Sequence, residues 1–212
     1  MTRRVRVLIA DDHAMFADGI RRLLESEYEV VGSVADGRSL LEQTQTLHPE
    51  VVVADVSMPL LNGIEAARQL RAADKRLKII LLTMHDDVTF ASRAFEAGVS
   101  GYLLKHCASD ELLIAMKEVL AGRTYVTPRI AGDLLQVMQR HDGQAQEVHL
   151  TQREREILQL LAEGKTMKEV AAILDVSTRT VEFHKYNLME KTGLHTTAEL
   201  ALYAAKHGIV DL

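Results

Sequence analysis

Acidic side chains stand at the ends of two strongly apolar segments in the first half of the chain. Asp11 and Asp12 follow VRVLIA, and Asp55 ends VVVAD. A buried carboxylate is costly unless a cation or a hydrogen-bond donor meets it. Thr83 and Lys105 end two further apolar segments, KIILLT and SGYLLK, and offer a hydroxyl and an ammonium group. We therefore asked what chemistry these five residues could perform together.

The combination of carboxylates, a hydroxyl and a lysine suits phosphoryl transfer. Three carboxylates held close together raise one another's pKa unless a cation lies among them. Oxygen ligands suit Mg2+, which proteins usually hold with one or two carboxylates and substrate phosphate. A carboxylate beside such an ion can attack a phosphoryl group while the cations neutralise the transferring oxygens. We expect an aspartyl phosphate, and we interpret His13 and His85 as neighbours rather than ligands because the acids suffice.

An alternation of strands and helices up to about residue 121 would bring these side chains together. Apolar, β-rich segments alternate with segments whose apolar residues recur at three- and four-residue spacing. This pattern predicts a doubly wound α/β domain with a five-stranded parallel sheet, whose ligands lie outside the carboxyl ends of the strands. If the first strand is central, the first, third and fourth strands are neighbours. The expected strands are 5–10, 29–34, 51–55, 78–83 and 100–105.

Length and composition limit the remaining possibilities. A chain of 212 residues favours two domains. With 25 Lys plus Arg against 30 Asp plus Glu, the net charge of -5 excludes a global basic field for nucleic acid or anionic membrane. The single cysteine, Cys107, excludes an internal disulfide framework. No segment approaches the roughly 18 apolar residues of a membrane span, so we expect a soluble, cytoplasmic protein without a membrane partner.

Four motifs, in this order and with these separations, resemble the receiver domain of bacterial two-component response regulators. They are DDH (11–13), DVSMPLLNG (55–63), LLTMHDD (81–87) and GYLLK (101–105), and the resemblance covers about residues 5–121. It implies a flavodoxin-like strand order. It also implies that Asp55 is phosphorylated from a phosphohistidine of a partner histidine kinase. Asp11, Asp12, Asp55 and the main-chain carbonyl of Ser57 would hold Mg2+.

The same resemblance implies roles for three further residues. Lys105 would pair with the phosphoryl oxygens, Thr83 would swing to hydrogen-bond them, and Tyr102 would follow Thr83 inward in the active state. An enzyme with Asp55 as nucleophile, such as a phosphatase resembling the haloacid dehalogenases, remains an alternative. Such an enzyme would want a second acid two residues after the nucleophile, where this chain has Ser57.

The second half of the chain is predicted to be helical. Residues 122–147 contain Pro, Gly and the polar run RHDGQAQE, so they are interpreted as a linker with a short helix around 129–140. From residue 148 to 212, Thr151 with Glu154 and Thr166 with Glu169 have capping-box spacing, and Ser177 is a plausible N-cap. Four helices follow, and the short DVS turn between the second and third predicts a helix-turn-helix domain.

The third of these helices has two different faces. At about 100° per residue, Val181, Leu188 and Thr192 fall on one side, with His184 at the border. An arginine and two aromatic residues lie opposite, as suits a recognition helix in the DNA major groove. Lys185 at the margin and Lys168 on the preceding helix are predicted to contact phosphate. The predicted DNA-binding residues are Lys168, Ser177, Arg179, Thr180, Glu182, Phe183, Lys185 and Tyr186.

LTQRE and TMKEVAAILDVSTRTVEFHKYNLMEKTGL resemble the LuxR-type effector domain shared by quorum-sensing activators and nitrate-type response regulators. The resemblance implies a dimer on promoter DNA, with the fourth helix supplying much of the contact between subunits. Glu182 and Tyr186 replace the basic residues common in relatives, although Glu182 could accept from cytosine N4. From Gln144 onward, eight Lys plus Arg stand against ten Asp plus Glu, a net of -2. Few phosphates are neutralised per subunit, which favours two subunits on paired half-sites.

These observations lead to a phosphorylation switch as the working hypothesis. We expect the receiver, linker and effector of the unphosphorylated protein to mask the recognition helix or the fourth helix. Phosphorylation of Asp55 would free two chains to form a homodimer and bind DNA. A phosphorylation-controlled protein-interaction regulator without direct DNA binding remains the alternative, because the helical domain carries no net positive charge.

Overall fold

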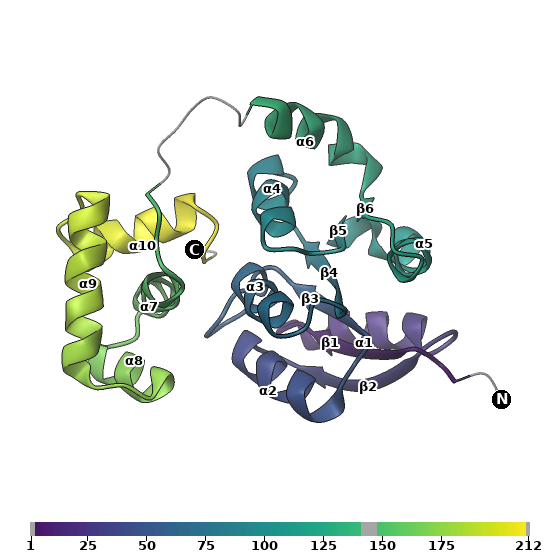
Figure 1. Cartoon of the computed structure of the whole chain (residues 1–212), viewed down its shortest axis with the longest axis horizontal. Coiled ribbons are helices and arrows are strands. Elements are labelled where there is room, and N and C mark those ends of the chain that lie inside the picture. The colour runs from purple at the N-terminus through teal and green to yellow at the C-terminus, as the bar shows by residue number, and fades with distance from the viewer. Residues whose placement is uncertain (1–2, 141–147, 211–212) are drawn as a thin grey trace. The chain divides into compact units, whose positions relative to one another are not determined.

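A parallel sheet organises the N-terminal half of the chain in the computed structural model, which describes residues 3–140 and 148–210 (Figure 1). Within these residues, six strands are ordered β2-β1-β3-β4-β5-β6. The order reverses beside β1, so the carboxyl ends of β1, β3 and β4 meet at one edge, as the doubly wound prediction requires. The strands are β1 (Arg6–Ala10), β2 (Glu29–Val34), β3 (Val51–Asp55), β4 (Lys78–Thr83), β5 (Gly101–Leu104) and β6 (Tyr125–Val126).

Helices cover both faces of this sheet, which is why its central strands are apolar on both sides. Helices α1 and α5 share one hydrophobic core with β1, β3, β4 and β5. Helices α2, α3 and α4 contact one another in sequence order along the chain. The helices are α1 (Ala14–Leu24), α2 (Gly37–Leu47), α3 (Gly63–Ala73), α4 (Val88–Glu96), α5 (Ala108–Leu120) and α6 (Pro128–Arg140).

The sheet differs from the expected one at its far edge. Five strands were predicted, but β6 adds a sixth, pairing Tyr125 with Gly101 and Val126 with Tyr102. Two residues are too few to show a strand periodicity, so tertiary pairing rather than local sequence defines β6. Lys105 does not end β5 but begins a short 3-10 helix (Lys105–Cys107).

The expected short helix around 129–140 is present as α6, which contacts α4. It therefore belongs with the sheet rather than standing apart from it: α1–α6 fall in one compact unit and the later helices in a second. Residues 141–147 of the expected linker lie outside the described residues. Nowhere in 3–140 and 148–210 is a helix both long and apolar enough to cross a bilayer.

The C-terminal unit consists of the four expected helices. Both predicted capping boxes form, at Thr151 with Glu154 and at Thr166 with Glu169, and the Ser177 side chain caps the third helix by accepting from the Thr180 N–H. The helices surround a core that includes Ile157, Val170, Val181, Leu188 and Leu200. They are α7 (Gln152–Ala162), α8 (Met167–Leu174), α9 (Thr178–Thr192) and α10 (Thr197–Lys206).

Candidate functional site

Asp55 is the acid that the fold holds most firmly. It ends β3, all five residues of which are buried, and only 3% of its own surface is exposed. The Ser57 N–H donates to Asp55 Oδ1 at 3.3 Å. Helix α3 begins at Gly63, where a Cβ atom would lie 2.1 Å from the Asp55 carbonyl oxygen. The close approach of α3 therefore requires glycine and fixes the backbone from which the carboxylate projects.

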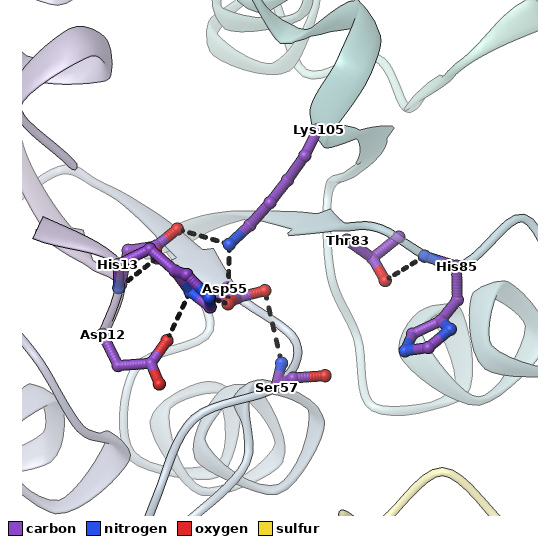
Figure 2. Close-up of polar contacts among 8 residues, drawn as sticks. Asp12, His13, Asp55, Ser57, Thr83, His85 and Lys105 are labelled. Carbon is purple, nitrogen blue, oxygen red and sulfur yellow. Dashed lines mark hydrogen bonds and ion pairs between the residues drawn. The ribbon is translucent and has the colours of Figure 1, made fainter. Parts of the chain in front are cut away.

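The Lys105 ammonium joins two of the buried carboxylates (Figure 2). Its Nζ donates to Asp55 Oδ2 at 2.7 Å and lies 2.8 Å from Asp11 Oδ2. It also lies 4.7 Å from the centre of the Phe16 ring, a cation-π contact. Burial raises the pKa of Asp55 to about 6, although the hydrogen bond and positive charge of Lys105 oppose that rise. The carboxylate thus sits in an environment that favours any added cation.

Four potential metal ligands converge at this edge of the sheet. Asp11, Asp12, His13 and Asp55 each offer one ligand atom, and these atoms all lie within 4.8 Å of one another. Asp11 Oδ2 is buried and makes no hydrogen bond of good geometry, despite its closeness to Lys105. Three carboxylates against one ammonium leave two negative charges. The oxygen-rich donor set and this charge fit a divalent cation such as Mg2+.

Thr83 and Tyr102 lie on the neighbouring strands β4 and β5, and both are fully buried. The Thr83 hydroxyl accepts a hydrogen bond from the His85 N–H at 3.1 Å (Figure 2). The His85 ring stacks on Phe90 of α4, with ring centres 5.2 Å apart. Burial raises the pKa of Tyr102, and the Thr83 hydroxyl acts in the opposite direction. Contacts thus lead from Thr83 to the first turn of α4, while the buried Tyr102 hydroxyl on the neighbouring strand makes no hydrogen bond within the described residues.

The predicted core and outer faces of α9 are both observed. Val181 and Leu188 are fully buried, whereas Thr192 is half-buried and donates its hydroxyl proton to the Leu188 carbonyl. On the other side, Phe183 is 61% and Tyr186 68% exposed, which is a large exposure for aromatic side chains. The exposed predicted DNA contacts are Lys168, Ser177, Arg179, Glu182, Phe183 and Tyr186, and the half-buried ones are Thr180 and Lys185.

Lys185 has a partner that its position in the sequence did not suggest. Its Nζ donates to the Thr197 hydroxyl at 2.9 Å, which joins α9 to the first turn of α10. At the other end of α9, Lys191 donates to both carboxylate oxygens of Glu154 at 2.7 and 2.8 Å, and Glu154 also completes the capping box of α7. Two lysines therefore fix the orientation of α9 within its domain.

Sequence reasoning missed three features of these sites. It treated His13 as a neighbour of the acids, whereas the structure places its Nδ1 atom among them. It did not single out Gly63, although a glycine that opens a helix soon after a Pro is a signal of close backbone approach. It also overlooked the capping box of Thr196 with Glu199 at the start of α10, which has the same spacing as the two that were predicted.

Comparisons with known proteins agree with both halves of the chain. Residues 7–117 match the family model of the response regulator receiver domain, and residues 148–204 match that of bacterial regulatory proteins of the luxR family. The transcriptional regulatory protein MctR of Rhizobium johnstonii is 36% identical, over 100% of this chain and 99% of its own. The response regulator GacA of Pseudomonas aeruginosa is 33% identical, over 98% of each chain.

Solved structures give the same result. RcsB from Salmonella enterica serovar Typhimurium, bound to promoter P1flhDC in the presence of the phosphomimetic BeF3-, aligns with a TM-score of 0.60 and 30% identity. The alignment covers 94% of this chain and 97% of that one. The match therefore includes the sheet domain and the helical domain of one regulator. The chain belongs to the LuxR family of two-component response regulators, which are DNA-binding transcriptional regulators rather than enzymes.

Proposed function

We propose that Asp55 is the phosphorylation site of this regulator and that its phosphorylation by a cognate histidine kinase promotes dimerisation and promoter binding. The observation that carries this proposal is the buried Asp55 carboxylate, which lies 2.7 Å from the Lys105 ammonium at the carboxyl edge of the sheet. A carboxylate is a weak nucleophile, so cations that neutralise the transferring phosphoryl oxygens contribute most of the catalysis.

The side chains around Asp55 have separate tasks in this proposal. Asp11, Asp12, Asp55 and the Ser57 carbonyl hold Mg2+, which when bound supplies positive charge to the phosphoryl oxygens. Lys105 is already placed to accept a phosphoryl oxygen as its partner, because its Nζ donates to Asp55 Oδ2. The raised pKa of Asp55, about 6, still leaves most of the carboxylate ionised and nucleophilic at neutral pH.

Thr83 and Tyr102 would report the phosphorylation of Asp55 to the rest of the domain. The Thr83 hydroxyl accepts from the His85 N–H, and His85 stacks on Phe90 of α4. If Thr83 turns to donate to a phosphoryl oxygen, it releases this contact, and the loop before α4 can repack. Tyr102 is fully buried on the neighbouring strand β5, and in this proposal it responds to the movement of Thr83.

The helical domain would bind promoter DNA through α9. Arg179, Glu182, Phe183 and Tyr186 are exposed on one face, where they can reach base edges in the major groove. Lys168 on α8 contacts phosphate, as do the backbone N–H groups at the start of α9. Lys185 contributes to phosphate binding from the margin once it releases Thr197.

The domain boundaries follow from this division of tasks. The receiver motifs cover residues 5–121, residues 122–147 include β6 and α6, which pack on the receiver, and lead to the effector, and the DNA-binding domain covers 148–212. The weak charge of the effector favours a homodimer on paired half-sites, which makes dimerisation the step that phosphorylation controls. Both partners, the kinase and promoter DNA, place the regulator in the cytoplasm.

Chemical phosphorylation tests the proposed acceptor. The full-length protein is treated with acetyl phosphate and Mg2+, and the acyl phosphate is reduced with borohydride and located by mass spectrometry. We expect one modified position, Asp55, and no modification in Asp55→Asn. Modification at another carboxylate, or equal labelling of Asp55→Asn, contradicts the proposal.

A further inference from the structure

We propose that His13 is a nitrogen ligand at the acidic cluster and that it raises the affinity of this site for first-row transition ions relative to Mg2+. The inference rests on the proposed function, because it concerns the same metal site. It goes further by assigning a role to a side chain that oxygen-only coordination of Mg2+ does not use.

The position of the imidazole carries the inference. His13 Nδ1 lies 2.8 Å from Asp12 Oδ1, 3.4 Å from Asp11 Oδ1 and 4.0 Å from Asp55 Oδ2. Ligand atoms bound to one ion about 2.0–2.3 Å away lie about 3–4 Å from each other. The distances to Asp11 and Asp55 are those of donors around one ion, whereas 2.8 Å to Asp12 is a hydrogen-bond distance, a contact that a bound ion would replace (Figure 2).

The local backbone explains why this side chain is available. His13 is the N-cap residue of α1, but its side chain makes no capping hydrogen bond, in contrast to the Asp, Ser and Thr residues usual at that position. Its N–H donates instead to Asp11 Oδ1 at 2.9 Å, which closes the turn after β1. The turn thus presents the imidazole to the carboxylates, and 68% of its side chain is exposed to solvent from which an ion could enter.

The set of ligand atoms predicts which metal ions should bind more tightly because of His13. Carboxylate and carbonyl oxygens suit both Mg2+ and Mn2+, but an imidazole adds affinity for first-row transition ions, least for Mn2+ among them, and adds little for Mg2+. The imidazole could otherwise serve only as a hydrogen-bond donor to Asp12. In that case it competes with a metal ion, so its removal would tighten binding. The two explanations predict opposite changes in affinity.

Mn2+ is the probe that separates them. Titration of full-length protein at about pH 8, where free imidazole is neutral, is followed by the electron paramagnetic resonance of free Mn2+. Mg2+ affinity is obtained by competition. We expect His13→Ala to weaken Mn2+ binding about tenfold and Mg2+ binding less than about twofold. His149→Ala, which removes an exposed histidine of the helical domain outside the cluster, should leave both affinities unchanged.

Pulsed resonance of bound Mn2+ supplies a second readout. Coupling to a nitrogen nucleus should be present in the wild type and in His149→Ala, and absent in His13→Ala. Unchanged or tighter Mn2+ binding in His13→Ala, or a wild type without nitrogen coupling, overturns the role of His13. If Asp55→Asn then still binds Mn2+ and Mg2+ as tightly as the wild type, the metal site of the proposed function fails as well.

Discussion

The Lys105 ammonium lies 2.7 Å from Asp55 Oδ2 and 2.8 Å from Asp11 Oδ2, so one cation is shared between two buried carboxylates. Lys105 begins the 3-10 helix after β5, while the two acids stand at the ends of β1 and β3. These two contacts therefore link the ends of β1, β3 and β5 at the edge of the sheet where phosphoryl transfer is proposed. One ammonium group does not balance two carboxylates, so a net negative charge remains at this edge.

Loss of this cation should destabilise the receiver domain. Lys105→Met leaves buried carboxylates without a partner, and we expect the free energy of unfolding to fall by about 3 kcal/mol in chelator. Added Mg2+ should recover much of the loss, because it replaces the missing charge. Lys117→Met is the matched control: its pair with Glu27 is exposed and should contribute less than about 1 kcal/mol. Equal losses in the two variants, measured by urea denaturation, would contradict this account.

Receiver stability should depend on pH through Asp55. Burial raises the pKa of Asp55 from 3.8 to about 6, so the folded state binds the proton more tightly than the unfolded state. This contribution is fully present below about pH 4 and is lost as the pH rises through about 6. Without metal, we expect wild type to lose up to about 3 kcal/mol relative to Asp55→Asn across this range. Parallel stability curves for the two proteins would exclude the raised pKa.

Gly63 should be required for the position of Asp55. A Cβ atom at Gly63 would lie 2.1 Å from the Asp55 carbonyl oxygen, so Gly63→Ala must displace α3 or the backbone of the acceptor. We expect acetyl phosphate labelling to slow by about tenfold or more. Gly19→Ala is the control, because a Cβ there meets no atom within 4 Å and should stabilise α1 by about 0.5–1 kcal/mol. If acetyl phosphate labels Gly63→Ala as fast as it labels Gly19→Ala, the close contact with the Asp55 carbonyl oxygen is relieved without moving the Asp55 carboxylate, and the prediction is wrong.

Glu154 should stabilise the helical domain in a pH-dependent way. Burial raises its pKa, but hydrogen bonds from Lys191 and Thr151 outweigh burial and lower the pKa overall. A lowered pKa in the folded state contributes stability that is fully present above about pH 4.5, the ordinary pKa of a glutamate. This stability is lost as the pH falls through the lowered pKa of Glu154. Glu154→Gln should therefore cost about 1 kcal/mol at neutral pH and less in acid. Glu169→Gln, at the exposed capping box of α8, is the comparison. If thermal unfolding shows a larger loss of stability in Glu169→Gln than in Glu154→Gln, the ion pair of Glu154 with Lys191 is not the cause.

The exposed face of α9 should determine DNA affinity. Arg179→Ala removes a cation from the predicted major-groove face, and we expect DNA affinity to fall about tenfold or more. Arg22→Ala removes the same charge from α1 of the receiver and should change affinity less than about twofold. Fluorescence anisotropy with labelled DNA measures both. Equal effects of the two substitutions would mean that net charge, and not the face of α9, governs binding.

The sequence predicted those parts of the structure that local chemistry determines. Strands 51–55 and 78–83 were placed correctly because continuous apolar runs end at polar residues, and strand 29–34 because it is rich in valine. Helices α7 and α8 begin where their capping boxes indicated. The strand β6 was missed because two residues gain their structure only by pairing with β5. The strand predicted over residues 100–105 was one residue too long at each end, since β5 is Gly101–Leu104 and Lys105 begins a helical turn.

The sequence predicted which residues form the candidate site better than it predicted how they are arranged. Strand ends identified Asp11, Asp55 and Lys105, because parallel strands place their carboxyl ends at one edge. The position of His13 could not be predicted in the same way. A histidine after two acids can point to solvent or toward the acids. In the structure the His13 N–H donates to Asp11 and closes a turn that directs the side chain toward the acids, and the sequence does not show that turn.

The central claim, that phosphorylation of Asp55 controls DNA binding, is tested most directly by gel shift. Wild type and Asp55→Asn are each treated with acetyl phosphate and Mg2+ and titrated against DNA fragments that the protein itself retains from genomic DNA. We predict that treatment tightens DNA binding of the wild type and leaves Asp55→Asn unchanged. Equal DNA affinity of the treated wild type and the treated variant would contradict the claim.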